Sequence, residues 1–87
     1  MPRYYQTVCR TEGEARKAWD ATDRVFDCIE EVTGLARKRH SESLLWRFDD
    51  DLPVVERMLN ALRHTGLFTE IREIPEEFFL IARSYGV

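Results

Sequence analysis

The chain has 87 residues, with 13 basic and 16 acidic side chains and a formal net charge of −3. This length predicts one domain over residues 1–87, with a core small enough that a dimer or a bound partner would add to its stability. The hydrophobic fraction of 44% argues against a disordered chain, and the short apolar runs predict neither a membrane span nor a secretory leader. We therefore expect a cytoplasmic protein that does not engage a membrane.

The first two expected elements are a strand and a long amphipathic helix. The run 3–10 is rich in β-formers and predicts a strand, although its weak alternation does not say which face is buried. Thr11 and Glu14 have the spacing of a capping box, and Gly34 is placed to end a helix in a left-handed turn. Between these ends, apolar side chains recur every three or four residues, which predicts one continuous helix over 11–34.

The next two runs, 35–40 and 44–49, are expected to form a hairpin that turns at the intervening serines. The second run alternates, so that Leu45 and Arg47 share one face of the strand. Its other face is expected to meet the helices and carries the larger apolar side chains, Leu44, Trp46 and Phe48.

A second helix and a further strand follow. Asp51 as N-cap and Pro53 in the first turn predict the start of the helix, and Gly66 predicts its end. The run 67–74 predicts a strand that turns Phe68 and Arg72 away from the helices. The segment 75–85 fits a short helix or a strand, and its β-branched and aromatic content favours the strand.

The expected order is β-α-β-β-α-β with an extra C-terminal strand (or short helix). This order resembles a ferredoxin-like sandwich, an α+β fold that packs two helices on one face of an antiparallel sheet. The resemblance concerns the fold alone, because this architecture hosts unrelated functions.

The sequence predicts no enzyme. The glycines never cluster into a phosphate-binding loop, and Cys9 and Cys28 lack the close spacing of a metal or redox motif. A pairing of Cys9 with a histidine stays open as a nucleophile, but a small buried thiol is the commoner role. The aspartates at 49–51 lack the pattern of a calcium loop and fit the start of a helix. We therefore expect no metal and no cofactor.

The sheet face opposite the helices is the predicted partner surface. It would expose apolar, aromatic and arginine side chains together, which is the composition of interface cores. The candidate residues are Leu45, Arg47, Phe68, Arg72, Ile81 and Arg83. Another protein and a second copy of this chain are equally compatible with such a face, and a C-terminal segment folded over it is the alternative.

A nucleic-acid-binding regulator is the alternative function. It would use the one basic run of the chain, which comprises Arg37, Lys38, Arg39 and His40. The same run would equally suit a strand edge protected by charge, and the net charge of −3 disfavours a nucleic-acid partner. The expected third strand also lacks the glycine-rich aromatic signature of an RNA-recognition module.

The favoured reading is a small non-enzymatic protein-binding module. In size and acidic charge the chain resembles the inhibitors carried by phages and mobile elements, such as anti-CRISPR and toxin-immunity proteins. That resemblance implies an inhibitor that blocks a surface of its partner.

Overall fold

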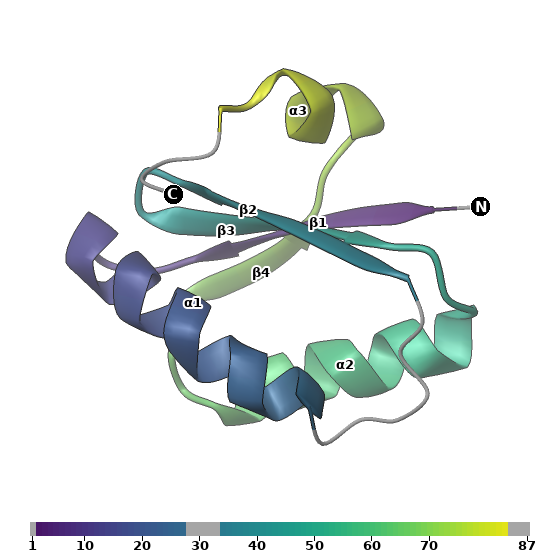
Figure 1. Ribbon diagram of the computed structural model, residues 1–87, viewed down its shortest axis with the longest axis horizontal. Helices are drawn as coiled ribbons and strands as arrows, with labels where there is room; N and C mark the ends of the chain where they lie inside the picture. Colours follow the sequence, from purple (N-terminus) through teal and green to yellow (C-terminus); the bar gives the residue numbers. More distant parts are fainter. Residues whose placement is uncertain (1, 28–33, 84–87) are drawn as a thin grey trace.

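The computed structural model describes residues 2–27 and 34–83, and Figure 1 shows their arrangement. In chain order the elements are β1 (Arg3–Val8), α1 (Glu12–Asp27), β2 (Leu35–His40), β3 (Ser43–Phe48), α2 (Leu52–His64), β4 (Glu70–Glu73) and α3 (Glu76–Ile81). The strands form an antiparallel sheet in the order β2-β3-β1-β4. The protein therefore belongs to the α+β class.

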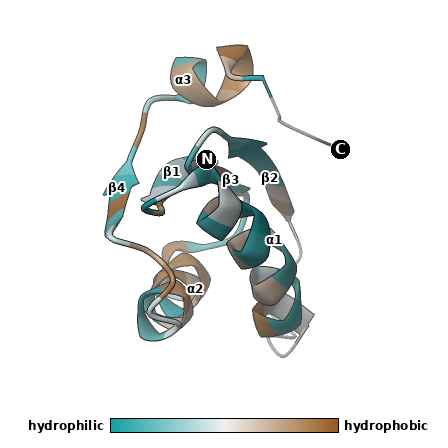
Figure 2. Cartoon of the chain, turned by 90° about the vertical axis from the view of Figure 1, so that its left-hand side faces the viewer, coloured by the Kyte–Doolittle hydropathy of each residue, from teal (hydrophilic) through white to brown (hydrophobic). Residues whose placement is uncertain are grey.

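Helices cover both faces of the sheet. Figures 1 and 2 place α1 and α2 on one side and α3 on the other. The main core lies under α1 and α2 and is built around Trp46, Phe48, Leu44, Met58 and Leu62. A second, smaller cluster lies under α3 and comprises Tyr4, Leu45, Ile74 and Phe79. The prediction that Trp46 and Phe48 face the two longer helices is confirmed.

The central position of β1 explains its weak alternation. Both edges of β1 are paired, with β3 on one side and β4 on the other. Tyr5 and Thr7 face the main core, whereas Tyr4 and Gln6 face α3, and all four are buried. A strand covered on both faces does not need the polar–apolar alternation of a half-exposed strand.

The start of α1 differs in detail from the predicted capping box. Thr11 Oγ1 accepts from the N–H of Glu14 at 3.1 Å, as expected. The Glu14 carboxylate, however, accepts from the N–H of Arg10 at 3.2 Å and not from that of Thr11. The described part of the helix ends at Asp27, and the predicted continuation over 28–33 lies outside the described residues.

Gly34 has a different role from the one predicted. Its φ is not positive, so it does not form the expected left-handed helix cap. Instead it lies opposite Asp49, whose N–H donates to the Gly34 carbonyl at 3.0 Å. A Cβ at position 34 would lie 2.7 Å from the Cβ of Asp49, so close approach of the two backbones requires glycine here. The left-handed cap predicted at Gly66 is confirmed, with φ of 69°.

The hairpin of β2 and β3 is confirmed. Its turn consists of Ser41 and Glu42, and His40 pairs with Ser43. Ser41 has a φ of 55°, a conformation that glycine adopts more readily than serine.

The prediction for the segment before β4 is wrong in part. The strand is limited to Glu70–Glu73, shorter than the predicted run 67–74. Phe68 precedes the strand, so strand alternation does not set its direction. It packs against the main core instead of lying on the opposite face.

The favoured C-terminal strand is also wrong, and the alternative helix is correct over Glu76–Ile81. Pro75 lies at the N-cap, and two glutamates occupy the first turn, where the helix dipole favours acids. The helix buries Phe79 against the sheet, which a return strand at the sheet edge would not do.

Candidate functional site

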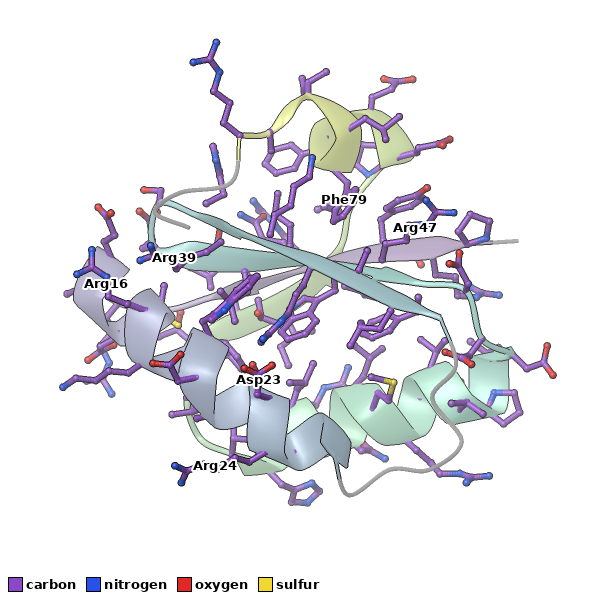
Figure 3. The ribbon with its side chains drawn as sticks, viewed as in Figure 1. Arg16, Asp23, Arg24, Arg39, Arg47 and Phe79 are labelled. Carbon is purple, nitrogen blue, oxygen red and sulfur yellow. The ribbon has the colours of Figure 1, made fainter. Side chains whose placement is uncertain are left out.

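The face predicted to be open is closed where α3 lies on it. Leu45 has no exposed area, because Phe79 of α3 packs over it together with Tyr4. The Tyr4 and Phe79 ring centroids are 5.4 Å apart, and Figure 3 shows Phe79 directed from α3 toward the sheet. The expected exposure of Leu45 is therefore wrong, and the alternative of a C-terminal cover is correct.

Lys38 of β2 forms hydrogen bonds with the C-terminal end of α3. Its Nζ donates to the carbonyl oxygens of Phe79 at 2.5 Å and Ala82 at 3.1 Å, and it lies 3.5 Å from that of Leu80. The same ammonium group lies 4.7 Å from the centroid of the Phe79 ring. A cation at the C-terminal carbonyls of a helix is favoured by the helix dipole.

Three further contacts fix the ends of the α3 segment. The Nδ1–H of His40 donates to the Arg83 carbonyl at 3.0 Å. At the other end the Tyr4 hydroxyl donates to the Glu76 carboxylate at 3.3 Å, and the Ile74 N–H donates to the Tyr4 carbonyl at 3.0 Å. The short helix is thus held by the sheet through side chains from β1 and β2.

The outer surface of α3 is apolar and exposed. Leu80 is 57% exposed and Ile81 is 80% exposed. A hollow of about 320 Å³ adjoins Ile81 and is lined by His40, Phe78, Ile81, Ala82 and Arg83. We call this surface, Phe78 and Leu80 to Arg83 with His40, the α3 surface. It brings together two of the predicted partner residues, Ile81 and Arg83, and adds Leu80, which the sequence analysis missed.

The other predicted partner residues lie elsewhere. Arg47 forms an ion pair with Asp49 at 3.1 Å, and Arg72 donates through Nε to the Gln6 side-chain oxygen at 2.8 Å. Both arginines belong to the face that α3 partly covers, with side chains 40% and 53% exposed. Phe68 lies on the opposite face, so the six predicted residues do not form one surface.

The side chains of the basic run point to both faces of the sheet. The β2–β3 register places Arg37 and Arg39 opposite Trp46 and Leu44, on the face of the main core. Lys38 lies opposite Leu45, on the α3 face. Consecutive residues of a strand point to opposite faces, so these four side chains do not form one basic patch.

Arg37 joins the edge strand β2 to α1. Its guanidinium lies 3.8 Å from the centroid of the Trp19 ring and donates to the Trp19 carbonyl at 2.7 Å. It also donates to Thr22 Oγ1 at 2.9 Å and forms an ion pair with Asp23. Burial lowers the pKa of the Arg37 guanidinium, and the carboxylates of Asp23 and Asp20 oppose that shift. Arg39 is also largely enclosed, with 6% of its surface exposed.

The candidate nucleophile Cys9 is chemically unsuited to that role. It is buried, with 2% of its surface exposed. Burial, followed by the nearby charge of Glu14, raises the pKa of the Cys9 thiol to about 11. Little of the reactive thiolate therefore exists at neutral pH.

The aspartates at 49–51 line a hollow of about 590 Å³ with Arg3, Tyr4 and Glu73. Within residues 2–27 and 34–83, no group of three or more histidine, cysteine or acidic side chains is arranged to hold a metal ion. No helix of this described part is long and apolar enough to cross a membrane.

The fold and the α3 surface define a small α+β protein with an antiparallel sheet between two helices and a third, shorter helix. Comparisons with protein-family models, with curated proteins and with solved structures found no match for this chain.

Proposed function

We propose that this protein is a non-enzymatic protein-binding module of the cytoplasm that acts by occupying a surface of its partner. The observation that carries the proposal is the α3 surface, where Leu80 and Ile81 present apolar side chains to solvent beside an apolar hollow. Exposed aliphatic and aromatic side chains next to an arginine are the composition that interface centres favour.

The way α3 is held supports this role. An isolated helix of six residues would not keep its shape in water. Here Lys38 binds carbonyls at its C-terminal end, His40 binds the Arg83 carbonyl just beyond that end, and Phe79 anchors its inner side. The outward side chains are therefore presented on a fixed support, which lowers the entropy lost on binding.

The test compares substitutions at two exposed aliphatic residues, Ile81 and Leu52. Ile81→Asp places a charge on the α3 surface at a residue with few internal contacts. The matched control is Leu52→Asp, because Leu52 is 42% exposed and lies at the start of α2 on the other side of the sheet.

Each variant would be used, beside the unaltered protein, to capture partners from a lysate of the source organism with and without nuclease. We expect one stoichiometric protein that survives nuclease, is retained by Leu52→Asp and is lost with Ile81→Asp. Retention of that partner by Ile81→Asp, in a protein that unfolds at the same temperature, would contradict the α3 surface as its binding site.

The ferredoxin-like arrangement is part of the proposal at the level of the fold. Two features support it. Helix α1 connects β1 to β2, and β3 lies between these two strands in the sheet; helix α2 connects β3 to β4, and β1 lies between those two. Both helices of these two split β-α-β units lie on one face of the sheet. The third helix would then be an addition to that sandwich.

Inhibition of the kind carried out by phage proteins stays a prediction from size and charge. The nucleic-acid alternative also stays a prediction, and the division of residues 37–40 between two faces does not favour it. Loss of every partner on nuclease treatment would favour it over the proposed function.

A further inference from the structure

The sheet has two edges, and the hydrogen-bond pattern fixes which backbone groups each edge presents. Neighbouring residues of an antiparallel strand direct their N–H and C=O groups to opposite sides. The Ile74 N–H donates to the Tyr4 carbonyl, so Tyr4 and Ile74 form a hydrogen-bonded pair. Because such pairs alternate along the ladder, Tyr5 does not bond Glu73, and Thr7 does not bond Ile71. The N–H and C=O groups of Ile71 and Glu73 therefore point away from β1, toward the free edge of β4.

The β2 edge is ill suited to a second copy of itself. The same argument, applied to the Asp49–Gly34 hydrogen bond, directs the backbone groups of Leu35, Arg37 and Arg39 outward. Two β2 strands paired about Arg37 or Lys38 would bring like charges directly opposite one another. Such pairs are destabilising, and charged residues on an edge strand oppose edge-to-edge pairing.

The β4 edge, in contrast, is suited to pairing with a second copy of itself. In a two-fold antiparallel pair centred on Ile71, each Ile71 faces its own copy and Glu70 faces Arg72 of the other chain. Both Glu70 and Arg72 lie on the same face of the sheet, because they are two residues apart. Their side chains are 54% and 53% exposed, so both are accessible to a second chain. A pair centred on Arg72 would instead place two arginines together.

The backbone hydrogen bonds and the charge pairs both favour the same register. The outward N–H and C=O of Ile71 would form a hydrogen-bonded pair with those of its copy, at the register in which the charges also match. Figure 2 shows β4 at the outer left of the molecule, beyond both α2 and α3 in that view. Among the described residues, no helix therefore lies outside β4 on that side of the molecule.

We propose that two copies of this protein associate through their β4 strands, antiparallel and centred on Ile71, so that their two sheets become one continuous sheet. The paired segment is short, and a standard stable interface buries about 1,600 Å² in total. The dimer is therefore weak, and its population rises over the micromolar to millimolar range of protein concentration.

This inference is independent of the proposed function. The β4 edge and the α3 surface share no residue, so loss of the dimer leaves partner binding through Ile81 testable, and the reverse also holds.

Charge reversal is the decisive experiment, read by sedimentation equilibrium of the full chain over a wide concentration range. Glu70→Arg would bring two arginine side chains opposite one another at both symmetry-related positions of the dimer, and we expect the dissociation constant to rise at least about tenfold. The double variant Glu70→Arg with Arg72→Glu restores both pairs and should recover most of the original affinity. Failure of the double variant to dimerise better than Glu70→Arg would overturn the register.

Two further variants test the geometry directly. Ile71→Pro removes an N–H that the β1–β4 ladder does not use, so it should abolish the dimer with the fold retained. In a Cys28→Ser background, Ile71→Cys should form an intermolecular disulfide, since hydrogen-bonded pairs hold their Cα atoms about 5.5 Å apart. Ala36→Cys on the β2 edge is the matched control and should not cross-link. A monomer at every concentration, or cross-linking by Ala36→Cys alone, would refute the proposal.

Discussion

Removal of the Lys38 ammonium should loosen α3 without unfolding the rest of the protein. In Lys38→Met the aliphatic stem is kept, but the carbonyls of Phe79 and Ala82 lose donors at 2.5 and 3.1 Å. A hydrogen bond to a charged group contributes about 1.5–3 kcal/mol, and the partial exposure of Lys38 places its contribution at about 1.5–2 kcal/mol. Each 1.4 kcal/mol corresponds to about a tenfold change in the opening equilibrium.

The measurement is amide hydrogen exchange along α3. The Ala82 N–H, which donates to the Phe78 carbonyl at 3.2 Å, should exchange about 10- to 30-fold faster in Lys38→Met. Amides of α2 should keep their rates, because α3 packs on the opposite face of the sheet.

The other lysine of the chain offers the control. Lys17 lies on the exposed side of α1, so Lys17→Met removes the same charge without touching α3. Equal α3 exchange rates in the two variants would refute the idea that Lys38 holds the helix in place.

Three other predictions concern particular backbone and side-chain positions. Ser41→Gly should raise the free energy of unfolding by about 0.5–1 kcal/mol, measured by urea denaturation, because φ at this turn position is 55°; no gain would show that serine is unstrained there. Gly34→Ala should lower that free energy by about 1–3 kcal/mol, because its Cβ would meet Asp49 at 2.7 Å. Gly13→Ala has room in α1 and should raise the same free energy by about 0.5–1 kcal/mol. Equal effects at the two glycines would contradict the close approach of Gly34 to Asp49. Cys9 should resist thiol reagents in a folded Cys28→Ser protein, and rapid labelling at neutral pH would show that the thiol is exposed. Because burial raises the pKa of the Cys9 thiol from 9.0 to about 11, the free energy of unfolding should hold below pH 9 and fall as the pH rises toward 11.

The features that follow from local chemistry could be predicted from the sequence. The start of α2 at Asp51 and Pro53 and its end at Gly66 depend on residues within one turn of each boundary. The inward face of β3 follows from alternation along six residues. These signals are contained in the segment that they describe, so no knowledge of distant contacts is needed.

The C-terminal helix and the partner surface could not be predicted in the same way. The segment after Pro75 fits either period, and contacts with Tyr4 and Lys38, far away in the sequence, favour the helix. The prediction of a strand therefore misplaced the cover over Leu45 and concealed the exposure of Leu80. The helical period alone would not have identified the buried side, because it groups Phe78, Ile81 and Ala82, whereas the structure buries Phe79 and leaves Ile81 80% exposed.

The role of Arg37 also could not be predicted from the sequence. In the sequence this residue belongs to a basic run, which suggests binding to a phosphate backbone. In the structure its guanidinium lies between α1 and the edge strand, stacked on Trp19 and paired with Asp23. Only the three-dimensional position distinguishes an arginine that joins two elements from one that binds a ligand.

The central place of β1 has a consequence for how the chain assembles. The first strand of the sequence pairs with β3 and β4, which follow it by more than thirty and sixty residues respectively. Its neighbours on both edges are thus made after it, and the helix that covers Tyr4 is made after both of them. During synthesis, Tyr4 remains uncovered until α3 has emerged, whereas Tyr5 can be covered once α2 is present. We expect slow folding for a protein of this size, with the N-terminal strand as the segment that most needs protection from aggregation.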